Sequence, residues 1–314
     1  MAIRSDAFVF DGASSTPLDQ ALRDHFPGAS WAAIRKAITT GKVSVEGRVS
    51  NQTRALVSPL EEVQVRMSAP KLRPGEQPAT RQILYCDAHV LVVDKPAGIS
   101  SVDHEREPTS LQSQLRSWLT QHEKRTQPPL KVVHRLDKVT SGVMVFARTA
   151  TAQAALKQQF KAHTTGRFYL AIAHGAVREG VLKFRLVRDR GDGLRGITRD
   201  PGRGSYSETC VRVRERFARC TFVECQLATG RTHQIRIHLS QVGNPLVGEP
   251  VYSRGYNGVI LPAPRTLLHA AFLSFNHPVF RKRLEYESPL PSEFEQFLVE
   301  ERRRSRETPG VSTK

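Results

Sequence analysis

A guanidinium and a carboxylate lie two residues apart in the run 134–142, where Arg135 and Asp137 flank Leu136. In an extended segment residues i and i+2 point to the same side, so we expect both charged groups on one face and Leu136 directed inward. A nearby guanidinium favours the ionised form of a carboxyl group. Such an anionic side chain suits a nucleophile or a base, although the triplet alone also fits an ordinary ion pair beside a turn.

The residues after Asp137 predict the element that supports it. Residues 142–147 are apolar and indicate a buried strand, so the loop before them is attached to a rigid element. Helices are expected at 109–123, where leucines and Trp118 form one apolar stripe, and at 149–163. Further runs are typical of strands: 182–187, 209–216, 221–228 and 267–275. The pattern predicts an α+β domain with a large mixed or antiparallel sheet and flanking helices.

The first 67 residues predict a separate, smaller α/β module. A helix is expected after Thr16, and a second one between the cap Ser30 and Gly41, with Trp31 on its apolar face. A hairpin at 43–49 and a strand at 62–66 follow. Residues 68–81 contain three prolines within 68–78 and indicate a linker, and the polar residues 300–314 are expected to be a disordered tail.

The charge balance indicates a polyanionic partner. The chain has 47 Lys and Arg against 30 Asp and Glu, a net charge of +17, which favours nucleic acid first and an anionic membrane surface second. No run approaches the roughly 20 apolar residues of a membrane span, and the N-terminus lacks a signal-peptide apolar region. Four cysteines without paired spacing predict free thiols. We therefore expect a cytoplasmic protein without disulfides or structural zinc.

Several longer motifs occur in a fixed order. Residues 134–142 resemble the catalytic motif of the RluA-type RNA pseudouridine synthases. The chain also resembles further motifs of that family, at residues 91–99, 167–171, 229–249, and 267–270 with 277–278. The resemblance covers roughly residues 81–298 and implies a pseudouridine synthase-type catalytic domain at 82–299. Residues 1–67, with the spacing of glycines and valines at 38–47, resemble the αL-type RNA-binding module that many members carry.

The resemblance implies isomerisation of uridine to pseudouridine in RNA, without a cofactor or a metal. The target base must leave the helical stack to be reached. Asp137 would add covalently to the nucleotide or remove a sugar proton to form a glycal, and the sequence leaves both routes open. Tyr169 would stack on the uracil and assist proton transfer, Arg231 would pair with Asp137, and Arg135 would fill the gap left by the flipped base.

Other candidate contacts are less specific. Leu246 and Ile237 could line the substrate pocket, although ordinary core packing explains them equally well. In the small module, a local basic face predicts RNA contacts by Arg35, Lys36, Lys42 and Arg48. His233 and His238 lack the additional acidic ligand of a metal site, so both are expected to be structural hydrogen-bonding groups.

The basic segment 183–219 holds eleven Lys or Arg against five acids and predicts contacts with phosphates. Family members usually have a Lys-Met pair near here, where this chain has residues 194–196, Leu-Arg-Gly. The RNA contacts of this segment are therefore left open.

Two other functions remain as alternatives. One is a non-enzymatic RNA-binding protein that keeps the fold. The other is a glycosidic hydrolase, which usually needs two carboxylates about 5 to 5.5 Å apart, and no second acid accompanies Asp137 in its motif. The αL-type module favours ribosomal RNA over transfer RNA as the substrate, and nothing demands more than a monomer.

Overall fold

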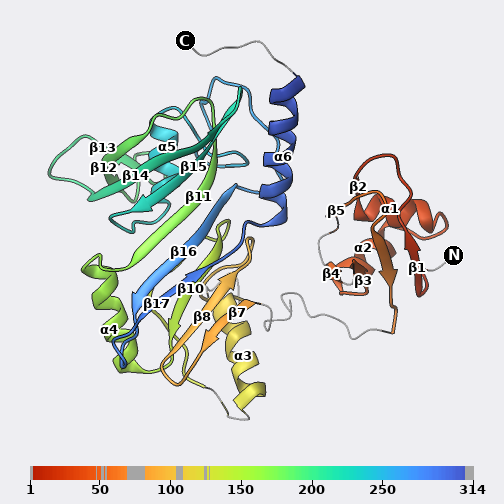
Figure 1. Ribbon diagram of the computed structural model, residues 1–314, viewed down its shortest axis with the longest axis horizontal. Helices are drawn as coiled ribbons and strands as arrows, with labels where there is room; N and C mark the ends of the chain where they lie inside the picture. Colours follow the sequence, from red (N-terminus) through yellow and green to blue (C-terminus); the bar gives the residue numbers. More distant parts are fainter. Residues whose placement is uncertain are drawn as a thin grey trace. The chain divides into compact units, whose positions relative to one another are not determined.

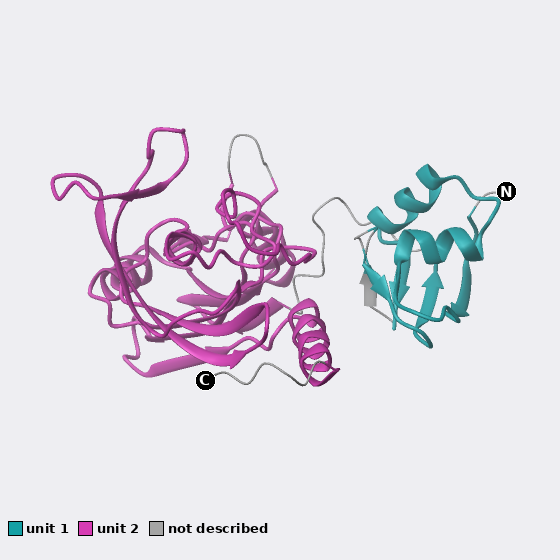
Figure 2. Ribbon diagram, turned by 90° about the horizontal axis from the view of Figure 1, so that it is seen from above, with its two compact units in different colours: residues 1–78 teal, residues 79–314 magenta. Residues whose placement is uncertain are grey.

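The computed structural model describes residues 3–46, 48–50, 53, 55–68, 82–103, 109–123, 126 and 128–307, without the side chains of Arg48 and Val49. The chain divides into two compact units, residues 1–78 and 79–314 (Figure 2). Each unit is described by itself. Among the described residues, no helix is long and apolar enough to cross a membrane. The expected linker falls almost wholly on residues 69–81, which are outside the described residues.

Unit 1 is a small sheet covered by two helices. The sheet has the order β1 (Asp6–Val9), β6 (Glu62–Val65), β3 (Val43–Val45), β4 (Arg48–Ser50), and β2 (Thr16–Pro17) pairs with β5 (Leu56–Val57). The helices are α1 (Leu18–His25) and α2 (Trp31–Thr39). The Ser30 hydroxyl accepts a hydrogen bond from the Ala33 N–H at 3.2 Å, so the predicted helix cap is confirmed.

One side chain of α2 differs from the prediction. Ile34 and Ile38 are fully buried, but Trp31 is 39% exposed. The guanidinium carbons of Arg23 and Arg35 lie 5.7 and 5.5 Å from its ring centroid. The indole therefore lies at the surface of the unit with two cations over it, because its position at the start of α2 is beyond the edge of the core.

Unit 2 is built on one large mixed sheet (Figure 1). Its strand order is β13 (Gly196–Thr198), β12 (Gly180–Val187), β14 (Ser205–Arg216), β15 (Cys220–Leu227), β11 (Gly166–His174), β16 (Leu268–Asn276), β10 (Ser141–Ala147), β8 (Val90–Lys95), β7 (Ile83–Cys86). In addition, β17 (Arg283–Glu287) pairs with β16 and β9 (Lys131–Val132) with β10. All pairs are antiparallel except β10 with β16. The predicted mixed sheet of an α+β fold is confirmed.

Four helices accompany this sheet in the described residues: α3 (Leu111–Glu123), α4 (Ala150–Lys161), α5 (Gln234–Gln241) and α6 (Ser292–Glu307). The predicted helices at 109–123 and 149–163 are confirmed as α3 and α4, and the Thr149 hydroxyl caps α4 by accepting from the Ala152 N–H at 3.0 Å. Figure 1 shows α3 beside β7 and β8, and α6 beside the strands at the other side of the sheet.

The prediction of a disordered tail from residue 300 is wrong for residues 300–307, which continue α6. This helix is held at its C-terminal half by side chains that a polar composition does not reveal. Glu301 is 3% exposed and pairs with Arg219, and Arg302 pairs with Glu215 at 2.6 Å. Charged residues with fixed partners thus extend the helix, and residues 308–314 are outside the described residues.

Candidate active site

Asp137 lies in the loop between β9 and β10, and several backbone contacts hold this loop in place. Residues 133–140 form no strand, in contrast to the extended segment expected from the sequence, but Leu136 is buried as predicted. The Leu136 N–H donates to the Ser101 hydroxyl at 3.1 Å, and this hydroxyl donates to the Leu136 carbonyl at 2.7 Å. The Thr140 N–H donates to the Asp137 carbonyl at 3.0 Å. The loop is therefore fixed to the protein on both sides of the carboxylate.

Lys95, at the end of β8, supports the same loop from inside the protein. Its side chain is fully buried, and its ammonium group donates to the carbonyls of Thr140 at 2.7 Å, Pro96 at 2.9 Å and Lys138 at 3.3 Å. Burial lowers the pKa of Lys95 to about 7, and the carboxylate of Asp137 acts in the opposite direction. Lys95 thus links two strand ends and places a buried amino group, with a pKa near neutral, behind the Asp137 loop.

Gly142 lets β10 approach β16 closely enough to pair in parallel. Its φ is +114°, and a Cβ built there would lie 2.2 Å from the Ala270 carbonyl oxygen. Only glycine fits this combination of backbone angle and contact. The end of the Asp137 loop is therefore joined directly to the centre of the sheet.

Arg236, on α5, brings the opposite charge to Asp137. Its Nη1 lies 3.5 Å from Asp137 Oδ2. Its Nε and Nη2 donate to the two carboxylate oxygens of Glu249 at 2.7 and 2.8 Å. The side chains of Arg236 and Glu249 are 5% and 0% exposed. Burial alone would raise the pKa of Glu249, but the hydrogen bonds and the charge of Arg236 outweigh it, so this pKa is lowered.

The turn before α5 is organised by Gln234. Its side-chain oxygen accepts from the Arg231 N–H at 3.0 Å and from the Thr229 hydroxyl at 2.7 Å, and its nitrogen donates to the Glu208 carbonyl at 2.9 Å. These bonds join the turn to β14 and set the rotation of α5. That rotation places Arg236 against Asp137.

His233, just before α5, faces Asp137 from another direction. Its backbone is left-handed, with φ +58°. Its Nε2 lies 3.9 Å from Asp137 Oδ1, and its Nδ1 lies 2.7 Å from the Tyr252 hydroxyl oxygen. Burial lowers the pKa of His233, opposed by the charge of Asp137 and assisted by that of Arg236. The imidazole is thus held in the neutral form beside the carboxylate.

Tyr169 comes from β11, a central strand, and is 9% exposed. Burial raises its pKa to about 12; Arg167 opposes this shift and Asp137 adds to it. Next to it, the guanidinium carbon of Arg167 lies 5.5 Å from the ring centroid of Phe160, and the His134 ring stacks on the same Phe160 at 4.4 Å. The phenol of Tyr169 therefore stays protonated beside a packed aromatic and cationic wall.

These groups surround a cavity of about 800 Å³. Its walls come from the Asp137 loop, the outer side of α4, β11, and the turn and first residues of α5. Asp137, Arg135, Tyr169, His233 and Arg236 all line it. The hollow is large enough for a nucleotide and combines one carboxylate with several guanidinium groups, which suits a substrate that carries phosphates.

Comparison with known proteins gives this geometry a family. Residues 89–241 match the family model described as RNA pseudouridylate synthase. The ribosomal large subunit pseudouridine synthase D of Xanthomonas campestris pv. campestris is 35% identical over 305 residues, which cover 93% of this chain and 91% of that protein. The chain belongs to the RluA-type RNA pseudouridine synthases.

Other members of the family agree with this assignment. The synthase D of Pseudomonas aeruginosa is 34% identical over 301 residues, 88% of this chain and 89% of that protein. A solved structure of human RNA pseudouridylate synthase domain containing 4 is 25% identical, covers 74% of this chain and 96% of that chain, and has a TM-score of 0.59. This pseudouridine synthase is therefore an isomerase that acts on RNA.

The structure brings three of the predicted site residues together in this synthase, namely Asp137, Arg135 and Tyr169. Arg231 lines the cavity, but its Nε donates to the Tyr206 carbonyl at 3.2 Å, and the arginine beside Asp137 is Arg236. The predicted pairing of Arg231 with Asp137 is thus wrong, because Arg231 lies in the turn before α5.

Leu246 and Ile237 do not line this cavity. Leu246 is fully buried in the main core cluster, and Ile237 is packed with Leu186 and Tyr252. The core-packing alternative therefore describes both residues. The cavity instead takes its apolar surface from Leu136, Leu227, Ile235 and Leu268, among others.

The residues of unit 1 that were predicted to contact RNA differ in the exposure of their side chains. Lys36 is exposed, and Arg35 is exposed although its Nε lies 3.4 Å from an Asp19 carboxylate oxygen. Lys42 is only 9% exposed, so its side chain offers RNA little surface. The side chain of Arg48 is outside the described residues.

The sequence reasoning missed three charged residues of the site, namely Arg236, Glu249 and Lys95. All three lie inside the motifs that carry the family resemblance. A signal was present for Arg236, since a helix that starts at Gln234 would turn one of its next residues toward the loop of Asp137. His233 and His238 do make the expected structural hydrogen bonds, His238 Nε2 to the Ser207 hydroxyl at 2.8 Å.

Proposed function

We propose that this pseudouridine synthase isomerises uridine in large-subunit ribosomal RNA and that Asp137 starts the reaction at the bond between base and sugar. The observation that supports the role of Asp137 is its place in the cavity wall, with its two oxygens facing Arg236 and His233. The substrate is proposed from the names of relatives that match nearly the whole chain. The proposal includes a monomer that works in the cytoplasm.

The surroundings of Asp137 suit an attacking carboxylate. Its side chain is 21% exposed, so one side remains open to the cavity while Arg236 orients the other. Arg236 is itself fixed by Glu249 and cannot turn away without leaving a buried carboxylate unpaired. A carboxylate prepared in this way can add to the nucleotide or remove a sugar proton, and the proposal covers both routes.

Tyr169 is proposed to stack on the flipped uracil. Its ring is the aromatic surface of β11 in the cavity, and its phenol, with a pKa of about 12, acts as a hydrogen-bond and proton donor at neutral pH. Arg135 lies in the Asp137 loop and lines the cavity without a hydrogen bond or ion pair to any described residue. It is free to enter the gap that the uracil leaves in the RNA.

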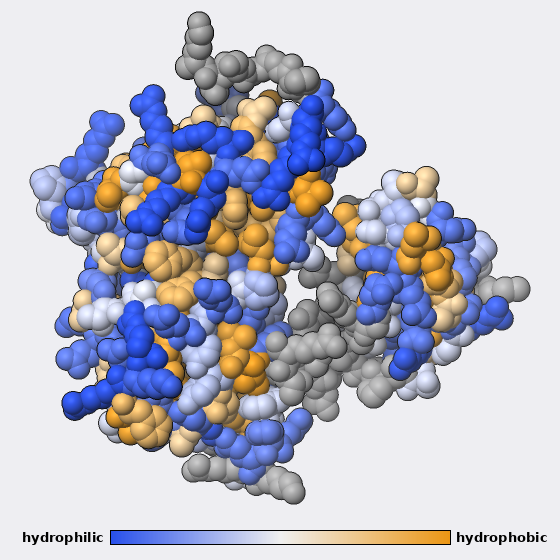
Figure 3. Space-filling model, in the orientation of Figure 1, coloured by the Kyte–Doolittle hydropathy of each residue, from blue (hydrophilic) through white to orange (hydrophobic). Residues whose placement is uncertain are grey.

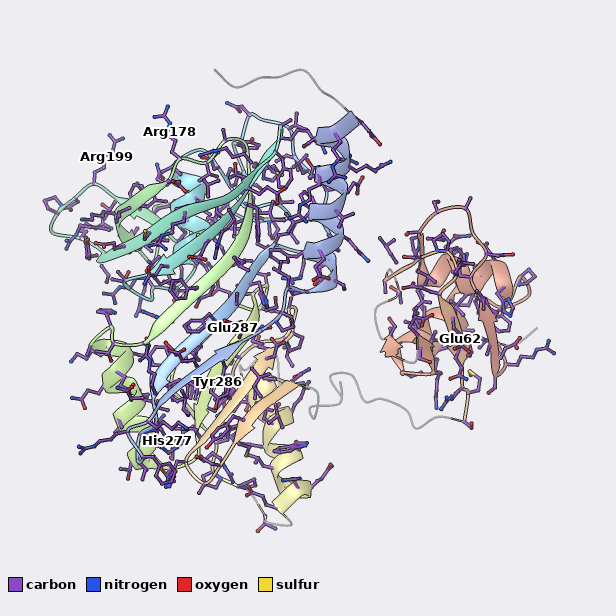
Figure 4. The ribbon with its side chains drawn as sticks, in the orientation of Figure 1. Glu62, Arg178, Arg199, His277, Tyr286 and Glu287 are labelled. Carbon is purple, nitrogen blue, oxygen red and sulfur yellow. The ribbon has the colours of Figure 1, made fainter. Side chains whose placement is uncertain are left out.

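Two surfaces away from the cavity are proposed to hold the RNA. One is the exposed cationic pair Arg35 and Lys36 of unit 1. The other is the region of β12 to β14, where hydrophilic side chains cover the surface (Figure 3). Arg178 and Arg199 point outward there (Figure 4) and can contact phosphates without reading the sequence.

Release of tritium from carbon 5 tests the proposal, because pseudouridine formation replaces the C5–H bond with a bond to the sugar. We expect wild-type protein to release tritium from an unmodified large-subunit ribosomal RNA transcript labelled at C5, and less from transfer RNA transcripts. Asp137→Asn, which keeps the shape of the side chain, should release none while it binds the transcript normally. Asp11→Asn, at an exposed position outside both groups of proposed RNA contacts, is the matched control and should behave as wild type.

Three outcomes would contradict all or part of this proposal. Equal release by wild type and Asp137→Asn would remove Asp137 from the mechanism. Binding without release by the wild type on every RNA would support the non-enzymatic alternative. Release from transfer RNA but not from ribosomal RNA would overturn the substrate and leave the chemistry intact.

A further inference from the structure

The isomerisation ends with the loss of a proton from carbon 5 of the base. Once the N1–C1′ bond has broken and the C5–C1′ bond has formed, C5 carries both its hydrogen and the sugar. When the proton leaves, the C5–H electron pair becomes the C5=C6 double bond, the C6=N1 electrons move to N1, and N1 takes up a proton. The step is redox-neutral and needs a base beside the uracil.

Most titratable groups of the cavity wall are unsuited to accept this proton. Tyr169 has a pKa of about 12 and is a phenol at neutral pH. Arginines remain protonated. His134 is partly buried, and its Nε2 already accepts a hydrogen bond from the Val145 N–H at 3.1 Å. Asp137 is the one carboxylate among the described lining residues and already serves the first step in the proposed function.

His233 has the geometry of the missing base. It lines the cavity, its side chain is 31% exposed, and its Nε2 is 3.9 Å from Asp137 Oδ1. The proposed function places the sugar–base bond beside this oxygen. On the other side of the ring, Nδ1 lies 2.7 Å from the Tyr252 hydroxyl. When Nδ1–H donates to this hydroxyl, the lone pair of Nε2 faces the cavity.

We propose that Nε2 of His233 removes the C5 proton of the rearranged uracil, with Tyr252 holding the imidazole in the required tautomer. This inference rests on the proposed function. The imidazolium that forms has both N–H groups directed at acceptors, Nδ1–H at Tyr252 and Nε2–H at Asp137. It then returns its proton to solvent through the open side of the cavity.

The charges around His233 fit a base that is neutral before the step and stabilised after it. Asp137 and Glu249 favour the imidazolium, and Arg236 and Arg195 disfavour it. Tyr252 is a hydroxyl held in place by packing, with the guanidinium carbon of Arg236 at 5.2 Å from its ring centroid. Burial adds to the preference for the neutral imidazole in the free enzyme.

His233→Asn is the variant of choice, because asparagine tolerates the left-handed backbone of this position better than most residues with a side chain do. We expect pseudouridine formation to fall about 100-fold or more, as is typical for loss of a general base. We also expect deuterium at C5 of the RNA transcript to slow the variant and not the wild type, because proton removal becomes the slowest step. A merely structural loss would not produce this isotope effect.

RNA transcribed with 5-fluorouridine separates this step from the earlier ones. Fluorine at C5 cannot leave as a cation, so the reaction stops once the C5–C1′ bond has formed. We expect wild type and His233→Asn to rearrange fluorinated uridine at equal rates, although they differ on uridine. If the wild type rearranges neither RNA, the proposed function fails before the role of His233 is tested.

His163→Asn is a matched control. His163 also has a left-handed backbone, with φ +57°, and lines the same cavity from the end of α4. The same substitution there should give no isotope effect at C5. The proposal is overturned if His233→Asn shows no isotope effect, if it loses fluorinated and normal substrate equally, or if His163→Asn gives the same isotope effect.

Discussion

Both faces of the large sheet carry a hollow whose wall includes an arginine that pairs with a glutamate, but the two arginines differ in burial and in partners. The cavity that contains Asp137, here called the front cavity, also contains Arg236. The Arg236 side chain is 5% exposed, pairs with Glu249 and directs Nη1 to Asp137. The rear hollow, about 490 Å³, holds Arg214, 56% exposed, which pairs with Glu224. The other residues of the rear hollow are Phe168, Leu170, Arg212, Ala271, Phe272, Glu287 and Ser288, and Figure 4 labels Glu287 on β17.

This difference shows what distinguishes a reactive site from a paired surface. In the rear hollow Glu224 is 10% exposed, but Arg214 is 56% exposed and in contact with water, and a pair with a solvated partner contributes less than a fully buried one. In the front cavity Arg236 is buried and is fixed by the buried carboxylate of Glu249. Its Nη1 still faces a second carboxylate, that of Asp137, which is open to the cavity. Strand β11 lines both hollows. Arg167 and Tyr169 face the front cavity, and Phe168 and Leu170 face the rear hollow.

The largest effect on stability and activity should come from removal of Arg236, and removal of Arg214 is the comparison. Arg236→Ala leaves Glu249 buried without its partner, so we expect the free energy of unfolding of unit 2 to fall by about 3–5 kcal/mol and activity to be lost. Arg214→Ala should lower it by less than Arg236→Ala does, because Arg214 is 56% exposed and water already screens its charge. Denaturant unfolding of both variants, with the tritium assay, measures the contrast.

A conservative change keeps this comparison testable if Arg236→Ala does not fold. Arg236→Lys retains the charge and loses the two-pronged contact with Glu249. It should fold and still be clearly less active than wild type. The distinction between the two hollows fails if Arg214→Ala is as destabilising as Arg236→Ala.

The alternation along β11 gives the next largest effect. Stacking of an aromatic ring on a base contributes about 1–3 kcal/mol, so Tyr169→Leu should reduce kcat/KM by roughly 5- to 150-fold. Tyr169→Phe keeps the ring and should retain more of the activity. Steady-state kinetics on the ribosomal RNA transcript tests both.

Leu170→Ala, one residue away on the rear face, is the control for Tyr169. It should lower the stability of unit 2 and leave kcat/KM unchanged, because its side chain faces the rear hollow. Equal losses of kcat/KM in Tyr169→Leu and Leu170→Ala would mean that the effect comes from the strand and not from the face.

Acid should weaken the front pair. The pKa of Glu249 is lowered in the folded state from 4.5, so its stabilising contribution is complete above its unfolded pKa and is lost as the pH falls through the folded value. The difference in unfolding free energy between wild type and Glu249→Gln should therefore shrink between about pH 6 and about pH 3. A constant difference across this range would show that Glu249 does not carry the charge assigned to it.

The smallest effect is expected for Arg231. Its side chain is exposed and makes one hydrogen bond among the described residues, from Nε to the Tyr206 carbonyl. Arg231→Ala should change kcat by less than about fivefold, the range of an exposed charge contact, and weaken RNA binding at most modestly. A loss as large as that of Arg236→Lys would restore the catalytic role that the sequence suggested for Arg231.

Much of the scaffold could be predicted from local sequence. Periodicity and caps located α2, α3 and α4, and apolar runs located the central strands, because each of these signals acts within a few residues. The end of α6 could not be predicted in this way, since Glu301 and Arg302 find their partners 82 and 87 residues away, at Arg219 and Glu215.

The sequence by itself determined the reactive loop: Asp137 in its motif, Tyr169 on a strand, and a basic chain suited to RNA. Only the tertiary structure decided which arginine reaches Asp137 and which apolar residues form the cavity. The physical reason is that the position of Arg236 depends on the rotation of α5, which is set by hydrogen bonds from Gln234 to β14 and by the buried pair of Arg236 with Glu249. The apolar wall is assembled from the Asp137 loop, β15, β16 and α5, which are far apart in the sequence. Contacts between segments far apart in the chain leave no pattern in residue spacing.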